Sequence, residues 1–314
     1  MSTRTLLRST IAFLAALFLS ASAHAQLFRA YLAPDGNDAN PCTLAQPCRL
    51  LPAALTAVAS GGEIWMLDSA NYNTATVTIG KSVSILVVPG AVGSVVAIGG
   101  PAISITANDI DLTLRNLVIV PLTGGGGTQG ISMTGASNLT IEQCLVAKLP
   151  SHGVFVLGAG TVKIVDTIIR NSTGYGVFLQ DGVKGAISRT HLLANASGNV
   201  VARTTLPGTT TASVTDSVIS GGTEGLLAYA DGDATSNARI FVTRSTIEDT
   251  SFALDSVAVA GSAAITVSYS TVTNNSFGWH IGGADRAFIK TLGNNHIADN
   301  TNAPVGVLTP TSLQ

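Results

Sequence analysis

The sequence predicts an all-β fold, a right-handed parallel β-helix of about ten coils with a short N-terminal capping helix. Three observations predict it. A short motif recurs at intervals of 22 to 28 residues, an apolar segment led by glycine precedes most copies, and the composition suits strands and tight turns. Only 11% of the 314 residues are charged and 33 are glycine, which is typical of many short strands rather than of helices.

The recurring motif is an apolar residue, a small hydroxyl or thiol residue three positions later, and an apolar residue two positions further on. Its copies are Ile141-Cys144-Val146, Ile164-Thr167-Ile169, Ile187-Thr190-Leu192, Val214-Ser217-Ile219, Val242-Ser245-Ile247 and Val267-Ser270-Val272; Leu114-Leu117-Ile119 carries leucine in the middle, and Ile289 begins a degenerate last copy. One coil cannot bury its inner face alone, so coils stacked about 4.8 Å apart must supply the core. We therefore expect an interior of Ile, Val and Leu with a column of Thr and Ser, in which Cys144 is a buried thiol and Thr167→Val is nearly neutral.

A second strand precedes each motif. It begins at residues 130, 153, 176 and 278, with related segments at 199–202 and 225–228. Strand alternation then puts Val154 and Val156 inside and Phe155 outside. The leucine-rich repeat, the alternative solenoid, has a leucine-dominated pattern that this chain lacks. Three residues near the turn after the motif, Asn171, Asn195 and Asn274, are expected to stack and satisfy backbone groups of that turn.

Residues 1–25 are typical of a secretory signal peptide. Arg4 and Arg8 precede the apolar run 11–19, and Ala23-His24-Ala25 supplies the small-x-small cleavage pattern. Because nine apolar residues are too few to span a bilayer, the sequence predicts an exported protein without a transmembrane segment in the mature chain, located in the periplasm, on the cell surface or in the medium. Without the two arginines the 16 basic residues fall to 14 against 18 acidic ones, a balance that argues against a nucleic-acid surface.

The mature chain is expected to divide into an N-terminal cap, residues 26–62, and a β-helix, residues 63–314. Within the cap, residues 49–59 have helical apolar spacing, so an amphipathic helix should cover the strand edges of the first coil. Cys42 and Cys48 lie in a proline-bounded loop short enough to close, which in an exported protein predicts a disulfide.

These N-terminal features also carry a family resemblance. The opening 31–38 (YLAPDGND), the cysteine loop, the capping helix and the Gly61-Gly62-Glu63-Ile64 strand resemble bacterial exported right-handed β-helix repeat proteins of the pectin lyase-like superfamily. The resemblance covers essentially the whole mature chain and implies the fold. It does not imply one activity, because that superfamily includes lyases, hydrolases, epimerases and adhesins.

The catalytic signatures of those enzymes are missing from the sequence. There is no Asp-Asp or Asn-Thr-Asp of polygalacturonase-like hydrolases, and Ser151-His152-Gly153 matches their Gly-His-Gly only in part. The Arg-x-Pro-x-x-Arg of pectate lyases and the Asp-Pro-His-Asp of alginate epimerases are also absent. Hydrolysis by acid and base needs two carboxylates on one face, so any catalytic site must be divergent.

Two outward ladders are the candidate surfaces. Asp166, Arg189, Asp216 and Arg244 lie two residues after successive motif starts, so opposite charges should pair from coil to coil; they support the register or, as weak catalytic candidates, act on a glycan. The second ladder is Phe155, Phe178, Val201 and Leu227, followed by His280. Exposed, it would form a platform for sugar rings or a docking strip that serine could replace without loss of stability; cover by a loop or by the C-terminal tail is the alternative.

Longer loops are expected at 204–211, 231–238 and 258–263, rising as a wall on one side. Asp231 and Asp233 alternate with other oxygen-bearing residues as in a calcium loop, but the distal glutamate is missing, so a solvated turn is the simpler interpretation. Scattered histidines lack ligand spacing, so neither a metal site nor a cofactor is predicted.

The sequence thus favours an exported, non-catalytic β-helix protein that binds a polysaccharide or another component of the cell envelope. The alternative is a polysaccharide-active enzyme of lyase, hydrolase or epimerase type, with a divergent site on a face of the solenoid.

Overall fold

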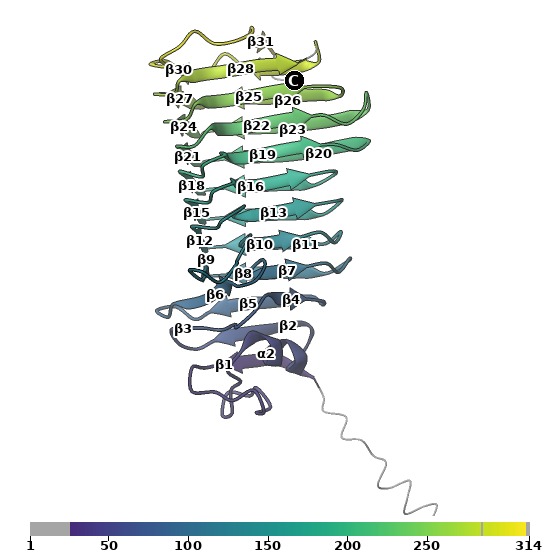
Figure 1. Ribbon diagram of the computed structural model, residues 1–314, viewed down its shortest axis with the longest axis vertical. Coiled ribbons are helices and arrows are strands. Elements are labelled where there is room, and N and C mark those ends of the chain that lie inside the picture. Colours follow the sequence, from purple (N-terminus) through teal and green to yellow (C-terminus); the bar gives the residue numbers. More distant parts are fainter. Residues whose placement is uncertain (1–25, 284, 312–314) are drawn as a thin grey trace, which may run out of the picture.

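The computed structural model describes residues 26–283 and 285–311, which wind into a parallel β-helix built from three sheets. Figure 1 shows the coils stacked along one long axis, with the single labelled helix at the N-terminal end. Successive strands of every sheet are paired in parallel, each to the next coil. The predicted fold class is confirmed. The predicted signal peptide, residues 1–25, lies outside the described residues.

We call the three faces sheets A, B and C. Sheet A contains β1 (Leu27–Leu32), β2 (Val58–Met66), β5 (Val83–Val87), β8 (Asp111–Arg115), β11 (Asn138–Glu142), β14 (Thr161–Val165), β17 (Lys184–Ser188), β20 (Gly208–Thr215), β23 (Ser236–Thr243), β26 (Ser262–Ser268), β29 (Ala287–Thr291) and β31 (Thr309–Pro310). Sheet B contains β3 (Ala70–Asn71), β6 (Gly93–Ala97), β9 (Leu117–Pro121), β12 (Leu145–Ala147), β15 (Ile168–Arg170), β18 (His191–Leu193), β21 (Val218–Ser220), β24 (Thr246–Glu248), β27 (Thr271–Thr273) and β30 (His296–Ile297). Sheet C contains β4 (Val77–Ile79), β7 (Ile103–Ile105), β10 (Ile131–Met133), β13 (Val154–Leu157), β16 (Tyr175–Gln180), β19 (Gly198–Thr204), β22 (Glu224–Ala230), β25 (Phe252–Ala258) and β28 (Phe277–Gly283).

Each central coil passes from sheet C through sheet A to sheet B, in the order β13, β14 and β15 for one coil. The motif starts stack as predicted, because Ile141 pairs with Ile164 and Ile164 with Ile187. All three are at most 1% exposed. Like residues on neighbouring coils therefore form a continuous apolar interior along the solenoid.

The corner between sheets A and B is a single residue in the left-handed region. It is occupied in successive coils by Asn116, Gln143, Asp166, Arg189, Asp216, Arg244 and Tyr269, with φ between 46° and 60°. One such residue reverses the alternation of side chains, so the residue that follows it points inward again. Asn and Asp accept this conformation readily, whereas the arginines and the tyrosine hold it only because the stacked coils impose it.

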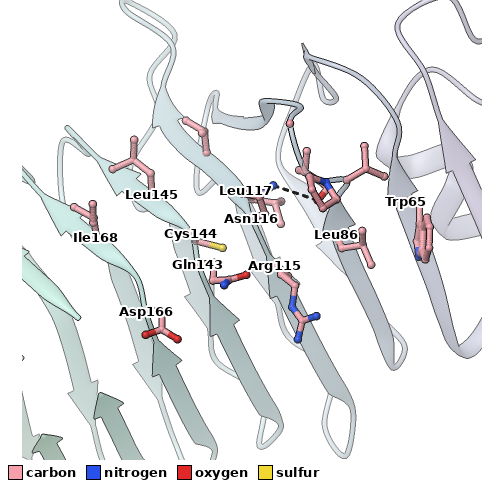
Figure 2. Close-up of a pocket in the computed structure, with 15 residues that line it drawn as sticks. Trp65, Leu86, Arg115, Asn116, Leu117, Gln143, Cys144, Leu145, Asp166 and Ile168 are labelled. Atoms are coloured by element: carbon pink, nitrogen blue, oxygen red, sulfur yellow. Dashed lines mark hydrogen bonds between the residues drawn. The ribbon is translucent and has the colours of Figure 1, made fainter. Parts of the chain in front are cut away.

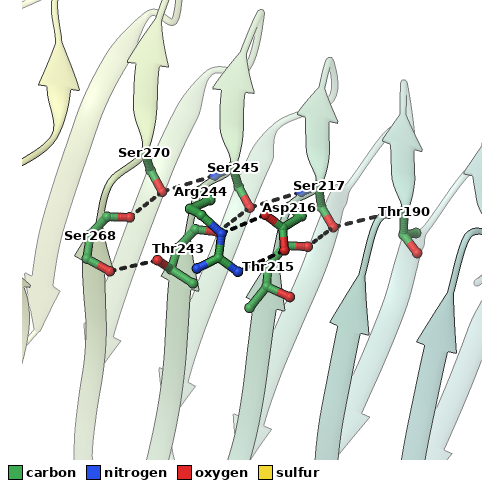
Figure 3. Close-up of polar contacts among 9 residues, drawn as sticks. All are labelled: Thr190, Thr215, Asp216, Ser217, Thr243, Arg244, Ser245, Ser268 and Ser270. Carbon is green, nitrogen blue, oxygen red and sulfur yellow. Dashed lines mark hydrogen bonds and ion pairs between the residues drawn. The ribbon is translucent and has the colours of Figure 1, made fainter.

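The residue after this corner forms the predicted column of small polar side chains. Cys144, Thr167, Thr190, Ser217, Ser245 and Ser270 are all at most 4% exposed. Each hydroxyl donates to the carbonyl two residues earlier, and most accept from a backbone N–H of the preceding coil, as Ser217 Oγ does from Thr190 at 3.2 Å (Figure 3). The column therefore replaces main-chain hydrogen bonds that the sharp corner would leave unmade. Cys144 is a free, buried thiol as predicted, and burial raises the pKa of its thiol to about 12.

Because of these bonds, we now expect Thr167→Val to be destabilising and not nearly neutral. Thr167 Oγ1 donates to the Val165 carbonyl at 2.9 Å and accepts from the Cys144 N–H at 3.3 Å. The Val165 carbonyl also accepts from the Gln143 N–H at 3.1 Å, but valine would leave the Cys144 N–H buried without a partner, so we expect a loss of about 1 to 3 kcal/mol in the free energy of unfolding. Denaturant unfolding measures it, with Thr140→Val on the outer face of β11 as the matched control. Equal midpoints for the two variants would contradict the hydrogen-bonding role.

A second buried polar column lies where sheet B ends. Asn195 is in it as predicted, its Oδ1 accepting from the Ser172 N–H at 3.1 Å. Asn171 and Asn274 are not; each occupies the left-handed turn position one residue earlier and is exposed. Asn275 instead carries the column, where it accepts from the Thr250 N–H and donates to the Ile247 carbonyl. The predicted positions of Asn171 and Asn274 in the column were one residue too early, because the exposed turn residue comes immediately before the residue that points inward.

The two ends of the solenoid are closed differently. At the N-terminal end the predicted helix is α2 (Leu51–Ala57), and Cys42 and Cys48 form the predicted disulfide. β1 already pairs with β2, so the predicted cap joins sheet A without a break. At the C-terminal end residues 301–311 cross the last coil, where the Trp279 indole N–H donates to the Gly306 carbonyl at 3.1 Å. No helix among the described residues is long and apolar enough to cross a membrane.

Candidate functional site

The charge ladder lies on the exposed corner between sheets A and B, as two separate pairs. Arg189 donates two hydrogen bonds to Asp166, at 2.7 and 3.0 Å. Arg244 donates two to Asp216, at 2.7 and 2.9 Å, and Figure 3 shows this second pair. The hydrogen bonds from these arginines hold the pKa of both carboxyls below the usual value. Asp166 and Asp216 are thus engaged carboxylates, which register the coils and are poor proton acceptors.

A groove runs along this corner over the early coils. Its volume is about 800 Å³, and its lining changes from apolar to polar across its width. Leu86, Leu145 and Ile168 supply apolar surface, and Arg115, Gln143 and Asp166 supply hydrogen-bonding groups, as Figure 2 shows. The polar side continues into a second depression of about 380 Å³, which Glu142, Lys163 and Arg189 also line. The left-handed corner builds this groove, since it turns the outward side chains of the two sheets toward a common space.

Trp65 lies at one end of the groove (Figure 2), and three neighbouring side chains hold its ring. The Arg29 guanidinium lies 4.0 Å from the ring centroid, and the indole N–H donates to Glu63 Oε2 at 3.0 Å. Tyr31 meets the ring edge-on, with centroids 6.3 Å apart. Since Arg29 is itself paired with Glu63, the indole is fixed before any ligand arrives.

The apolar ladder on the outer face of sheet C is not an exposed platform. Phe178 and Leu227 are each 9% exposed and Val201 is 1% exposed, and they form a second hydrophobic cluster outside the main core. Only Phe155 remains half-buried. The predicted outward direction is right, but the predicted exposure is wrong for Phe178.

The cover comes from Tyr175, at the start of β16, and from His152, which lies in the loop between β12 and β13. The ring of His152 lies 4.9 Å from that of Phe178, and Tyr175 meets Phe178 edge-on at 5.5 Å. His152 Nδ1 accepts the Tyr175 backbone N–H at 3.0 Å, and burial lowers the pKa of the imidazole. The outer face is therefore packed by the side chains of its own neighbouring row, which alternation within one strand does not reveal.

The same face carries an ionisable cluster that the sequence did not disclose. Asp255 stands on β25 between Leu227 and His280, and its Oδ1 lies 2.8 Å from His280 Nδ1. Asp255 is 7% exposed, and this burial raises the pKa of its carboxyl, although His280 partly offsets the effect. One signal in the sequence could have revealed Asp255, because this residue continues the outward ladder that begins at Phe155. The predicted ladder runs from Leu227 directly to His280 and omits the strand at residues 252–258.

Glu224 lies one row away, at the start of β22. The residue beside it on β19 is Gly198, where an added Cβ would be 2.9 Å from Glu224 Oε2. The Glu224 carboxyl therefore occupies space that a side chain at position 198 would fill, and it lies beside Tyr175. Burial, and next the charge of Asp255, raise the pKa of Glu224 to about 7. Its Oε2 is buried and has no hydrogen-bond partner within residues 26–283 and 285–311.

The expected loop wall is mostly strand. β19, β20, β22, β23, β25 and β26 extend into it, leaving short turns at 205–207, 231–235 and 259–261. Asp231 pairs with Arg203, and Asp233 accepts from the Thr235 N–H at 2.8 Å. Protein groups thus already occupy both carboxylates. Among the described residues no three His, Cys, Asp or Glu side chains gather as metal ligands would.

The chain was compared with family models, with curated proteins and with solved structures. Residues 102–301 match the family model described as the right handed beta helix region, while the comparison with curated proteins finds no match. Among solved structures, the pectate lyase Pel9A superposes with a TM-score of 0.63 at 14% identity, over 92% of this chain and 79% of that one. The GH136 lacto-N-biosidase from Eubacterium ramulus gives a TM-score of 0.53 at 8% identity, over 91% and 68%.

Identities this low show the fold alone, and they confirm the predicted right-handed, pectin lyase-like solenoid. The family match spans most of the coils described above. This chain belongs to the right-handed β-helix family.

Proposed function

We propose that this protein is exported and binds a glycan in the groove between sheets A and B. The observation that carries the proposal is the groove itself, about 800 Å³ in volume, which pairs an apolar side and a fixed indole with a row of hydrogen-bonding side chains. Sugar rings have the same two-sided character, with C–H faces that stack on aromatic rings and hydroxyls that need polar partners. A chain of sugars also matches a groove that crosses several coils.

The groove suits binding better than catalysis. The carboxylate of the groove, Asp166, is paired with Arg189, and Glu142 of the adjoining depression is paired with Arg115. Acid–base cleavage needs one carboxyl free to lose a proton and another free to take one. Two structural neighbours are named as a pectate lyase and a lacto-N-biosidase, which supports a glycan as the ligand and leaves its identity open to experiment.

Trp65→Ala tests the groove directly. A ligand probed first on a glycan array and then by calorimetry should bind at least about tenfold more weakly to the variant, since a fixed aromatic anchor contributes more than 1 kcal/mol. The matched control is Tyr269→Ala, which removes an aromatic side chain that is 61% exposed at the same corner but outside the groove. Equal affinities for wild type and Trp65→Ala would refute binding in this groove.

A further inference from the structure

Two carboxyl groups interrupt the apolar rows on the outer face of sheet C. Along the coils, one row consists of Phe155, Phe178, Val201, Leu227, Asp255 and His280. A second row, three residues earlier on each strand, consists of Tyr175, Gly198, Glu224, Phe252 and Phe277. The two carboxyl groups therefore lie where the outer apolar cluster of the middle coils meets the last coils of the solenoid.

The surroundings of Glu224 suit a neutral carboxyl group. Its Oε2 is buried and has no hydrogen-bond partner in the described part of the chain. Along its row it has Gly198 on one side and the ring of Phe252 on the other. A carboxylate in such a place loses the water that stabilises its charge, whereas a protonated carboxyl group loses much less.

Asp255 connects this face to the C-terminal end of the solenoid. Its carboxyl group is buried, and its Oδ1 lies 2.8 Å from His280 Nδ1. His280 in turn pairs with Val305 of the tail, and the Ile281 N–H donates to the Val305 carbonyl at 3.0 Å. Figure 1 shows β25 and β28, which carry Asp255 and His280, near the C-terminal end of the stack.

The ionisable groups that face the two carboxyl groups come from four neighbouring elements. They are Tyr175 on β16, Arg203 on β19, His280 on β28 and His152 in the loop before β13. The guanidinium of Arg203 already pairs with Asp231. Burial lowers the pKa of the His152 imidazole and so disfavours its cation. Two ionised carboxylates would therefore depend on His280 for compensation.

We infer that Glu224 and Asp255 form a proton-controlled contact, which fastens the last coils and the C-terminal tail to the rest of the solenoid. While Glu224 holds a proton, the outer face of sheet C stays packed. When both carboxyl groups are ionised they repel each other where water is scarce, and the coils that carry β25 and β28 loosen. These coils respond first because the end of a solenoid is supported from one side only. The inference does not depend on glycan binding in the groove.

The direction of the pH dependence follows from the proton on Glu224. Burial, and next the charge of Asp255, raise the pKa of its carboxyl group from the ordinary 4.5 to about 7. The folded chain then holds this proton more tightly than the unfolded chain does. The contribution of Glu224 to stability is therefore largest below pH 4.5, falls as the pH rises, and levels off above about 7. His152, with its lowered pKa, acts in the opposite direction, so variants must be compared at the same pH.

Thermal melting of Glu224→Gln at two pH values tests the inference. Glutamine has nearly the shape of glutamic acid and stays neutral at both. At pH 5 the variant should melt within about 2 °C of wild type, and at pH 8 it should melt at least about 3 °C higher. Asp255→Asn should move the loss of stability of wild type to lower pH, because the charge that faces Glu224 is gone. The control Glu248→Gln, on sheet B, should differ from wild type by the same amount at both pH values.

Hydrogen exchange at pH 8 shows which coils loosen. Wild type and Glu224→Gln are compared at one pH, so the intrinsic exchange rates are the same. Segments 252–258, 277–283 and 301–311 should exchange faster in wild type, and segments 131–133 and 154–157 should exchange alike. Three results would overturn the inference: no gain in melting temperature for Glu224→Gln at pH 8, an equal gain at both pH values, or equal exchange of the last coils in the two proteins.

Discussion

Ile164→Asp should prevent folding. Ile164 is 0% exposed and is stacked between Ile141 and Ile187 in the middle of sheet A. An unpaired carboxylate there costs several kcal/mol, as does the protonated form without a partner. The cost falls on two coil interfaces at once, because each coil is stabilised only by its neighbours. Total stabilities of domains are about 5 to 15 kcal/mol, so we expect no folded protein on expression, as judged by yield and by circular dichroism.

The matched control is Lys163→Asp. Lys163 is the preceding residue of β14 and points outward into solvent, so an aspartate there should change the melting temperature by only a few degrees. If Ile164→Asp is produced in normal yield and melts like wild type, the interior does not run through this ladder. Ile187→Asp, one coil further on, should behave like Ile164→Asp and would exclude a local peculiarity of β14.

The interior could be predicted because every stacked coil needs apolar residues at the same inward positions. The residue at the position of Ile164 must be apolar in each coil, so the same pattern recurs along the sequence. The motif can therefore be recognised even though the spacing between its copies varies. The single-residue turn at the end of sheet B was harder to predict, since its left-handed residue can be Lys, Asn, Ala or Asp. That is why Asn171 and Asn274 were assigned to the buried column that Asn275 occupies.

The surface was harder to predict because no stacking rule fixes it. Glu224 and Asp255 lie on different strands and different rows, and only the register of β22 against β25 brings them to one face. The fold of the Glu224 carboxyl over Gly198 depends on the absence of one side chain on a neighbouring coil. By contrast, Asp166 and Arg189 were found because they share one row, where pairing follows from the repeat itself.

The outer cluster of sheet C gives the second large expected effect. Phe178→Ser should destabilise the protein, although Phe178 contributes nothing to the interior stack. Its ring is 9% exposed and contacts Phe155, Tyr175 and His152, with centroids 4.9 to 5.6 Å away. Removing a buried phenyl ring costs about 3 to 5 kcal/mol in cores, and an outer cluster that water can partly refill should lose about 2 to 4 kcal/mol.

Chemical denaturation of Phe178→Ser and of Phe241→Ser makes the comparison. Phe241 is the same residue type on the outer face of sheet A, but it is 48% exposed, so its loss should cost about 0.5 kcal/mol or less. A melting temperature for Phe178→Ser within a few degrees of wild type would contradict the covered cluster and support the exposed platform that strand alternation alone predicts. A large loss instead means that the face is held rigid by its own side chains.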